Sequence, residues 1–510
     1  MFFTSGRINE RSLQYSLTTS VINAFVCLIG ITVCGTAYSA DPSPSPNIIL
    51  IVADDLGYGD LGCYGQKKIR TPRLDQMAKE GLRFTHFYAG SPVCAPSRCV
   101  LLTGKHAGHA AIRDNRETPP EGQIPLPEGE VILPELLHAR GYTTAMIGKW
   151  GLGAHGTSGD PLKPGRFDTF FGFACQAKAH NHYPISLWKN GKPFELPLDE
   201  ETTKALGRPG TGTFTAFEKF GTEYAGDLFE QEAIEFLREG HDKPFFLYLP
   251  FTAPHVALQV PDDSLRDYED KWDDPPYDGK LGYLPHETPR AAYAGMVSRL
   301  DRSVGRILDE LKALELEENT LVIFTSDNGP APENVGGADS KFFESAGPLR
   351  GLKGNAYEGG IRVPCIARLP GKITAEQESS LPLAFYDIFP TLCEMSGAKQ
   401  PENLDGLSFL PTLLGRGDQQ QHDFLYWEFA SYGGYQAVRM GDWKAIRPRL
   451  KKKDTEIELY NLSNDVGEKM NVAADQPDIV KKAAEIMSAQ HVRSKEFPLP
   501  AIDLPLKEAM

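Results

Sequence analysis

Short runs of apolar residues alternate along the chain with segments of helical periodicity. Four such runs are found, at 47–53, 142–147, 245–249 and 321–325. A continuous apolar run of this length is typical of a strand buried on both faces, as in a parallel sheet. Helical patterns lie between them, at 74–80, 133–140, 229–238 and 293–314. The alternation predicts a large open α/β sheet flanked by helices on both faces.

The pattern changes near residue 420. Short strand-like runs separated by turns follow, at 424–429, 435–440, 443–446 and 456–460, and then a helical pattern at 478–491. We therefore expect a smaller antiparallel α+β domain at 420–495, after an α/β domain at 45–415. Two segments rich in Gly, Pro, Asp and aromatic residues, 155–225 and 259–290, are predicted to be surface insertions near a site.

The first 39 residues have the pattern of an export signal. Arg7 and Arg11 precede an apolar run at 21–33, and the small residues around Ala37 offer a cleavage site. The run is too short and too early in the chain for a membrane span. We expect an exported protein, periplasmic or extracellular, with no stable membrane partner. An uncleaved anchor is the alternative.

Charge and cysteine content narrow the class of protein further. The 510 residues carry a formal net charge of −15, which argues against nucleic acid as a partner. An anionic small substrate stays possible, because the local field in a pocket can oppose the net charge. The cysteines outside the leader are too few and too scattered for a disulfide-rich scaffold, and their spacing does not predict a zinc site.

Candidate site residues stand just after the apolar runs, at Asp54, Asp55, Lys149, His255, Asp327 and Asn328. In open α/β sheets, ligands bind beyond the carboxyl ends of the strands. The two Asp-containing pairs supply only oxygen donors, three of them carboxylates, which suits a hard divalent cation. The alternatives are a helix cap at the first pair and an ordinary turn at the second.

The run Cys94-Ala95-Pro96-Ser97-Arg98, with Thr103-Gly104 downstream, is the most specific motif in the chain. Pro96 and Ser97 suit a helix start, so residue 94 is expected at a helix N-terminus. Free backbone N–H groups and the positive end of the helix dipole favour an anion there. A structural cysteine bridged to Cys99 is the alternative.

This motif resembles the signature of the type I sulfatases, in the alkaline phosphatase superfamily, whose signature cysteine is oxidised to formylglycine by a maturation enzyme. The other family motifs follow in order over about 45–475. The resemblance implies an alkaline phosphatase-like fold and hydrolysis of sulfate monoesters. It also implies one calcium ion held by Asp54, Asp55, Asp327, Asn328 and the formylglycine at 94.

The resemblance assigns the remaining roles as well. It implies that Arg98 and Lys149 hold the formylglycine hydroxyl, and that Lys149 and Lys353 bind sulfate. It implies that one hydroxyl of the hydrated aldehyde attacks sulfur while His255, in Ala253-Pro254-His255, protonates the leaving oxygen. Lys353 stands in Arg350-Gly351-Leu352-Lys353-Gly354, which resembles the family's second lysine motif.

One departure from the family pattern bears on the site. Many members have Lys-Trp-His-Leu-Gly where this chain has Gly151 as the third residue. His155 or His180 could replace that histidine, and we favour His180 because it stands in a dense polar and aromatic segment at 175–184. With His182, Tyr183 and Trp188, that segment predicts a sulfated carbohydrate as substrate, with galactose-type 4-sulfate as the specific guess. The alternative is that Tyr183 and Trp188 only pack the insertion against the core.

Two other functions stay open from the sequence. The first is a phosphate or phosphonate monoester hydrolase on the same fold. Two lysines and one metal fit a singly charged group better than a phosphate dianion, which often meets two metals. The second is a degenerate sulfatase homologue that binds glycans without cleaving them. Gly151 favours this reading, and the intact motif at Cys94 opposes it.

Overall fold

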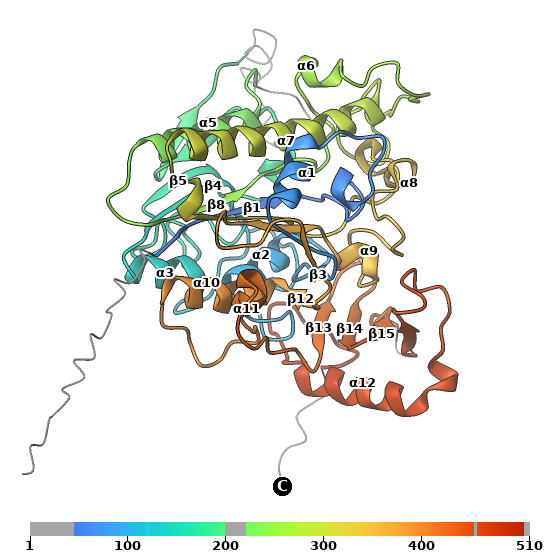
Figure 1. The fold of residues 1–510 in the computed structure, drawn as a ribbon. Helices are drawn as coiled ribbons and strands as arrows, with labels where there is room; N and C mark the ends of the chain where they lie inside the picture. Colours follow the sequence, from blue (N-terminus) through green and yellow to red (C-terminus); the bar gives the residue numbers. More distant parts are fainter. Residues whose placement is uncertain (1–44, 120, 199–220, 453–455, 504–510) are drawn as a thin grey trace, which may run out of the picture. The chain divides into compact units, whose positions relative to one another are not determined.

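The computed structural model describes residues 45–119, 121–198, 221–452 and 456–503 (Figure 1). The predicted export signal lies outside the described residues. A ten-stranded mixed sheet has the order β11-β2-β10-β9-β1-β8-β4-β5-β6-β7. Its five central strands are parallel: β9 (Thr320–Ser326), β1 (Asn47–Ala53), β8 (Phe245–Pro250), β4 (Thr143–Lys149) and β5 (Thr169–Phe173).

Shorter strands extend both edges of this parallel core. They are β10 (Cys365–Arg368), β2 (Leu82–Phe84) and β11 (Gln377–Ser379) on one side, and β6 (Ser186–Lys189) and β7 (Lys192–Glu195) on the other. Strand β10 runs antiparallel to β9, and β6 antiparallel to β5. The large open α/β sheet predicted from the apolar runs is confirmed. Strand β5 lies within 155–225, so that part of the predicted surface insertion belongs to the sheet instead.

Strand β1 shows why the sheet is covered on both faces. Ile48, Leu50 and Val52 pack into one hydrophobic core, while Ile49 and Ile51 pack into the other, and all five are fully buried. Each such side chain contributes about 1.5–3 kcal/mol through burial. Helices cover both faces: α1 (Pro72–Lys79), α5 (Ala225–Arg238) and α7 (Pro289–Ala313) on one, and α2 (Cys94–Thr103), α3 (Leu133–Ala139) and α10 (Ile388–Ser396) on the other (Figure 1).

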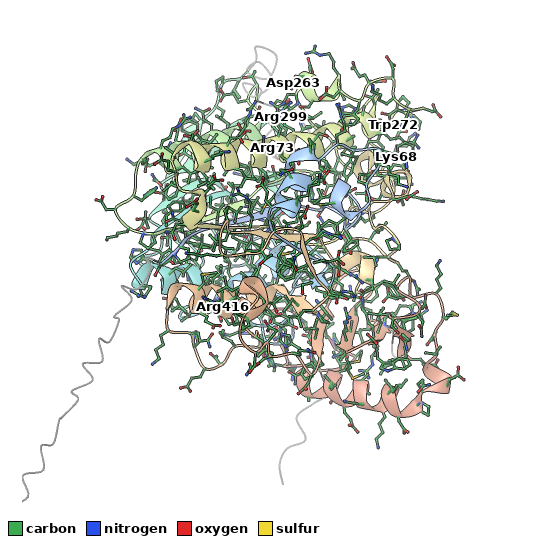
Figure 2. The ribbon with its side chains drawn as sticks, in the orientation of Figure 1. Lys68, Arg73, Asp263, Trp272, Arg299 and Arg416 are labelled. Carbon is green, nitrogen blue, oxygen red and sulfur yellow. The ribbon has the colours of Figure 1, made fainter. Side chains whose placement is uncertain are left out.

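Ion pairs tie the helices on the first face together. Arg299 on α7 pairs with Asp227 on α5 and lies 2.6 Å from Asp263, on the short helix α6 (Asp262–Leu265). Figure 2 labels Arg299 and Asp263 on this face of the sheet. Among the described residues, no helix is long and apolar enough to cross a membrane.

A four-stranded antiparallel sheet lies in the C-terminal region: β13 (Leu425–Phe429), β14 (Tyr435–Met440), β15 (Trp443–Pro448) and β16 (Glu458–Asn461). Helix α12 (Pro477–Gln490) packs on it through Ala483 and Met487. The predicted antiparallel α+β region is confirmed, while the boundary between 415 and 420 stays a prediction.

A buried ion pair joins this small sheet to the segment that follows the Lys353 loop. Lys444 Nζ on β15 lies 2.7 Å from Oε1 of Glu358, at the start of α9 (Glu358–Ile361), and both side chains are fully buried. The backbone N–H of Glu358 donates to Glu468, at 2.7 Å. Because Glu358 follows the Lys353 loop closely in sequence, these contacts fix the small sheet beside that loop.

Replacing Asp60 with Asn should flatten part of the pH dependence of stability. Asp60 is fully buried, accepts hydrogen bonds from Gly57 N–H and Tyr293 Oη–H, and has its pKa raised by burial to about 7. The folded state therefore holds this proton more tightly than the unfolded state, so the stabilisation is complete below about pH 4 and is lost as pH rises through 7. The wild type should lose up to about 4 kcal/mol relative to Asp60→Asn between these limits.

Denaturant unfolding at pH 4 to 8 measures the difference, with the exposed Asp309→Asn as control. Parallel pH profiles for wild type and Asp60→Asn would show that Asp60 is ionised throughout.

Candidate active site

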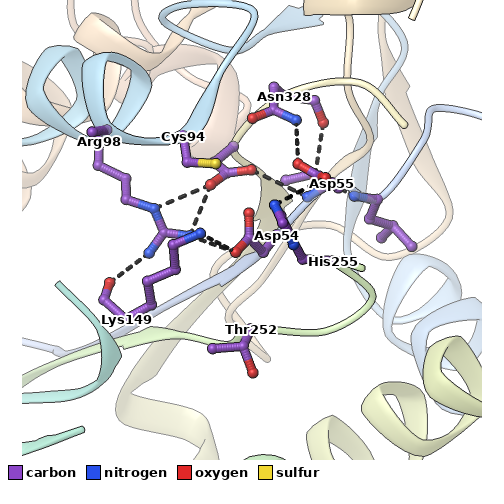
Figure 3. A network of polar contacts seen from close by, with 12 residues as sticks. Asp54, Asp55, Cys94, Arg98, Lys149, Thr252, His255 and Asn328 are labelled. Carbon is purple, nitrogen blue, oxygen red and sulfur yellow. Dashed lines mark hydrogen bonds and ion pairs between the residues drawn. The ribbon is translucent and has the colours of Figure 1, made fainter. Parts of the chain in front are cut away.

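The predicted metal-binding residues come together at the ends of two neighbouring strands. Asp54 and Asp55 follow β1, Asp327 and Asn328 follow β9, and β1 pairs with β9 in register. The Asp55 N–H donates to Asp327 Oδ1 at 3.3 Å, and Asn328 Nδ2 donates to Asp55 Oδ1 at 2.8 Å (Figure 3). All four side chains are buried.

Helix α2 brings Cys94 and Arg98 to the same cluster. Cys94 is the first residue of the helix, after Val93 in extended conformation, and it is fully buried. Arg98 lies one turn later, where its guanidinium donates to Asp327 Oδ2 at 2.8 and 3.1 Å and to the Lys149 carbonyl at 2.5 Å. Such charge-assisted bonds fix the orientation of the carboxylate. Cys94 and Cys99 are both free, so the alternative of a bridge between them is excluded.

Lys149 and Lys353 reach the cluster from different parts of the chain. Lys149 ends β4, and its Nζ donates to Asp54 Oδ2. Gly148 precedes it with φ +130°, and a side chain there would meet the Pro250 carbonyl oxygen at 2.0 Å, so only glycine fits. Lys353 Nζ lies 2.8 Å from the Asp55 carboxylate and 3.6 Å from Cys94 Sγ.

His255 faces these groups with a defined tautomer. Its Nδ1–H donates to the Val256 carbonyl, and its Nε2 lies 3.0 Å from Lys353 Nζ. Because an ammonium can only donate, Nε2 is the acceptor in this pair. The His255 ring stacks on His180, with centroids 4.2 Å apart and planes 10° apart.

His182 holds the backbone of His255. Its Nε2 lies 2.8 Å from the His255 carbonyl and therefore carries the proton, while Thr252 Oγ1 lies 3.1 Å from its Nδ1. Burial lowers the pKa of His182 to about 4, so the ring stays neutral at physiological pH. The sequence interpretation counted His182 among substrate contacts, whereas it is fully buried beneath the site.

Burial and neighbouring charges set the protonation of the cluster. Burial opposes ionisation of Asp54, but the charges of Lys149, Arg98 and Lys353 outweigh it and hold the pKa of Asp54 well below its usual value. Burial and the neighbouring Asp54 raise the pKa of Asp327 to about 7. Burial, followed by the Lys353 charge, lowers the pKa of His255 well below its usual value.

The donor set fits a divalent cation. Oδ1 of Asp54 and Oδ1 of Asn328 are buried, and neither receives a hydrogen bond from any described residue. Buried oxygens without a partner are rare because desolvation is costly, and a hard cation satisfies them. Ligand atoms of Asp54, Asp55, Cys94 and His255 also lie within 4.8 Å of one another.

A second cluster of His106, His109 and Asp405 has metal-ligand spacing but does not suit a metal. The Gly108 N–H donates to His106 Nδ1 at 3.1 Å, so Nδ1 is unprotonated and Nε2 carries the proton that faces Gln490, at 3.0 Å. Nε2 would have to lose that proton to bind an ion. His109 is already hydrogen-bonded to Asp405 at 2.9 Å. We therefore interpret the cluster as structural, because its hydrogen bonds hold distant parts of the chain together.

Neither residue proposed to replace the histidine missing at Gly151 would lie within 4 Å of a Cβ added there. His180 nevertheless lies in the site, and its supporting role stays a prediction. His155 Nδ1 bonds to Asp160 at 3.0 Å, and His180 stacks on His255. Among the described residues, only Gln176 would come within 4 Å of a Cβ added at Gly151, at 3.6 Å. Gln176 is 5% exposed, and its Oε1 receives no hydrogen bond from a described residue. Gln176 lies in the segment 175–184, from which the sequence analysis favoured His180 as the replacement for the missing histidine.

A cavity of about 610 Å³ opens over the cluster, which is in the range that holds drug-sized ligands. Its lining includes Asp55, His255 and Lys353, together with three tyrosines, Tyr283, Tyr432 and Tyr435. Tyr183 and Trp188 are not among the described residues that line it. Tyr183 is buried, and the Trp188 indole N–H donates to Glu121 at 3.1 Å.

Cations held among buried carboxylates, beside a helix N-terminus and under an open cavity, suit a hydrolase of anionic esters. Two family models match: Sulfatase over residues 46–398, and N-sulphoglucosamine sulphohydrolase, C-terminal, over 353–493. The chain belongs to the sulfatase family, with an alkaline phosphatase-like fold, and is a sulfuric ester hydrolase.

Curated relatives and solved structures agree with this assignment. The chain is 36% identical to human N-acetylgalactosamine-6-sulfatase over 394 residues, covering 74% of this chain and 68% of that protein. It is 32% identical to mouse steryl-sulfatase over 486 residues, covering 82% and 74%. The structure of Ps i-CgsB in complex with k-i-k-neocarrahexaose superposes with a TM-score of 0.72 at 29% identity, covering 88% of this chain and 94% of that one.

Proposed function

We propose that this sulfatase removes sulfate from carbohydrate esters, with a formylglycine made from Cys94 by a maturation enzyme and with one calcium ion. The observation that carries the proposal is the position of Cys94, which starts α2 and lies among Asp54, Asp55, His255 and Lys353. Burial and the charge of Asp54 raise the pKa of the Cys94 thiol to about 12. An unmodified thiol would be protonated at neutral pH and therefore a poor nucleophile.

The proposed roles follow from the contacts. Asp54, Asp55, Asp327 and Asn328 would hold the calcium ion, which when bound would offset negative charge on the sulfuryl oxygens. Formylglycine would supply an aldehyde carbon to which water adds, giving a diol. A cysteine thiol has no such carbon. Arg98 would hold the resulting hydroxyl. Lys149 and Lys353 would bind sulfate oxygens, because each places an ammonium in the cluster.

His255 would deliver the proton to the leaving oxygen from Nε2. Burial and the Lys353 charge keep the ring neutral with Nε2 as an acceptor, so Nε2 first has to take up a proton. The negative charge of a bound sulfate ester would offset Lys353 and favour that protonated ring, which then gives the proton to the leaving oxygen. His180 would keep the ring plane fixed through the stack, and His182 would fix its backbone.

The substrate proposal combines the cavity with the relatives. N-acetylgalactosamine-6-sulfatase by its name acts on a sulfated sugar, Ps i-CgsB was solved in complex with k-i-k-neocarrahexaose, and steryl-sulfatase by its name acts on steryl sulfates. We propose a sulfated carbohydrate, with a galactose-type 4-sulfate as the first choice, met after export to the periplasm or outside the cell. A panel of position-defined sulfated mono- and oligosaccharides tests this choice, with aryl and steroid sulfates beside it. Turnover of aryl or steroid sulfates alone would contradict it.

A phosphate or phosphonate monoester hydrolase is the rival activity. The two lysines and single metal cluster favour a monoanionic ester over a phosphate dianion. Comparing kcat/KM for aryl sulfate and aryl phosphate separates the two, and a higher value for phosphate would favour the rival. A degenerate, glycan-binding homologue would show no turnover with either ester.

Replacing His255 with alanine should slow poor leaving groups more than good ones. A sugar alkoxide needs a proton as the ester bond breaks, whereas an activated phenolate leaves without one. We expect a loss of about a hundredfold or more on sugar sulfates and a clearly smaller loss on 4-nitrophenyl sulfate. Steady-state kinetics on both substrates measure it, with the more exposed His138→Ala as control. Equal losses on both would rule out His255 as the general acid.

A further inference from the structure

Tyr432 is a large aromatic residue held in an unusual place. It lies in the turn between β13 and β14, is 64% exposed, and has φ +52°. A bulky side chain in the left-handed region is uncommon and points to a function rather than to folding. Gly433 and Gly434, which follow it, also have positive φ. A glycine at 432 would adopt the observed backbone conformation without steric cost. The chain instead presents a tyrosine ring to the cavity.

Contacts on two sides fix the turn over the site. Ser431 Oγ donates to Asp114, whose neighbour Asn115 accepts the N–H of Ala95, next to Cys94, at 3.1 Å. On the other side the Tyr432 ring covers Gly354, where an added Cβ would lie 3.0 Å from ring atoms. Gly354 follows Lys353. The ring also stacks on buried Phe429, with centroids 5.9 Å apart.

Tyr283 provides a second ring beside the chemical groups. Its centroid is 6.0 Å from that of His255, and both residues line the cavity with Lys353 and Tyr432. Leu281, two residues earlier, is 61% exposed. One tyrosine therefore stands beside the proposed proton donor, and the other covers Gly354, the residue that follows a proposed sulfate-binding lysine. A cavity of about 610 Å³ is far larger than a sulfate group, so space is left for the group that carries it.

We infer that Tyr432, together with Tyr283, forms the subsite for the sugar ring that bears the sulfate ester. The C–H face of the ring packs on the exposed Tyr432 ring, while the sulfate occupies the cationic cluster. The C-terminal sheet thus helps to bind the sugar that leaves, whereas the residues that act on the sulfate ester lie beyond the strand ends of the large sheet. This inference rests on the proposed function and specifies where its carbohydrate binds.

The test compares Tyr432→Ala, Tyr432→Phe and wild type on the best sulfated sugar of the panel. Tyr432→Ala should lower kcat/KM about tenfold, mainly through KM, while Tyr432→Phe should stay within about threefold of wild type because it keeps the ring. Inorganic sulfate, used as a competitive inhibitor of 4-nitrophenyl sulfate turnover, should keep its inhibition constant in both variants. Met470→Ala, an equally exposed apolar residue of the same region, is the control and should match wild type.

A parallel loss of affinity for inorganic sulfate would overturn the inference, because Tyr432 would then only brace the Lys353 loop. Unchanged kinetics in Tyr432→Ala would also overturn it. A failure of the proposed function shows in the wild type, as turnover of aryl sulfates without any turnover of sugars. In that case Tyr432→Ala should raise the KM for aryl sulfates and leave the inhibition constant of inorganic sulfate unchanged. Such a result would support a subsite at Tyr432 that binds an aryl ring in place of a sugar ring.

Discussion

Replacing Cys94 with alanine is expected to lower sulfatase turnover by about 10⁴-fold or more and to leave the fold intact. The loss is large because residue 94 is proposed to carry the nucleophile, and the cations around it cannot supply one. The fold should survive because alanine is a strong helix former and Cys94 opens α2 without a side-chain cap. The main core contacts of this helix come from Val100, Leu101 and Leu102 instead.

Steady-state kinetics and thermal unfolding of the same preparations measure the effect. Cys99→Ala is the matched control, because Cys99 is a buried cysteine on the same helix. It should keep activity even if some stability is lost through a small cavity. Peptide mass analysis should find the aldehyde or its hydrate at residue 94 in the active wild type. Full activity with an unmodified thiol would refute the proposal.

Four of the five strands of the parallel core could be predicted from local pattern, because they are continuous apolar runs. The fifth, β5, lies within 155–225, which was predicted to be a surface insertion. The run at 47–53 matches β1, and the run at 321–325 lies within β9. The short edge strands could not be predicted. Strand β2 has three residues and pairs with β10 and β11, which lie far away in sequence, so no local period marks it.

The chemical centre could be predicted for a related reason. Asp54, Asp55, Asp327 and Asn328 stand at strand ends, and parallel strands bring such ends to one edge. The cavity wall could not be predicted, because Tyr432 reaches the site only through the packing of the second sheet beside the Lys353 loop. The aromatic character of Trp188 suggested a sugar contact, but Trp188 is not among the described residues that line the cavity.

Replacing Asp327 should remove both the metal and the activity. Its carboxylate accepts two hydrogen bonds from the guanidinium of Arg98 and one from the Asp55 N–H. Asp327→Ala would take a proposed calcium ligand away and leave the fully buried Arg98 with little compensation, at a cost of about 3–5 kcal/mol in stability. Asp327→Asn is the cleaner variant, because it keeps the shape and removes only the charge.

We expect Asp327→Asn to lose bound calcium in metal analysis after gel filtration, and to lose about 10²- to 10³-fold in kcat/KM. Added calcium should restore part of that activity if the ligand set is only weakened. Asp301→Asn is the matched control, because Asp301 is also a buried aspartate but accepts the backbone N–H groups of Arg73 and Leu74, away from the cluster. Zinc at full occupancy in the active wild type, with activity that depends on it, would contradict a calcium site. Unchanged calcium in Asp327→Asn would show that Asp327 serves Arg98 alone, so that its loss of activity would trace to the orientation of the guanidinium beside residue 94.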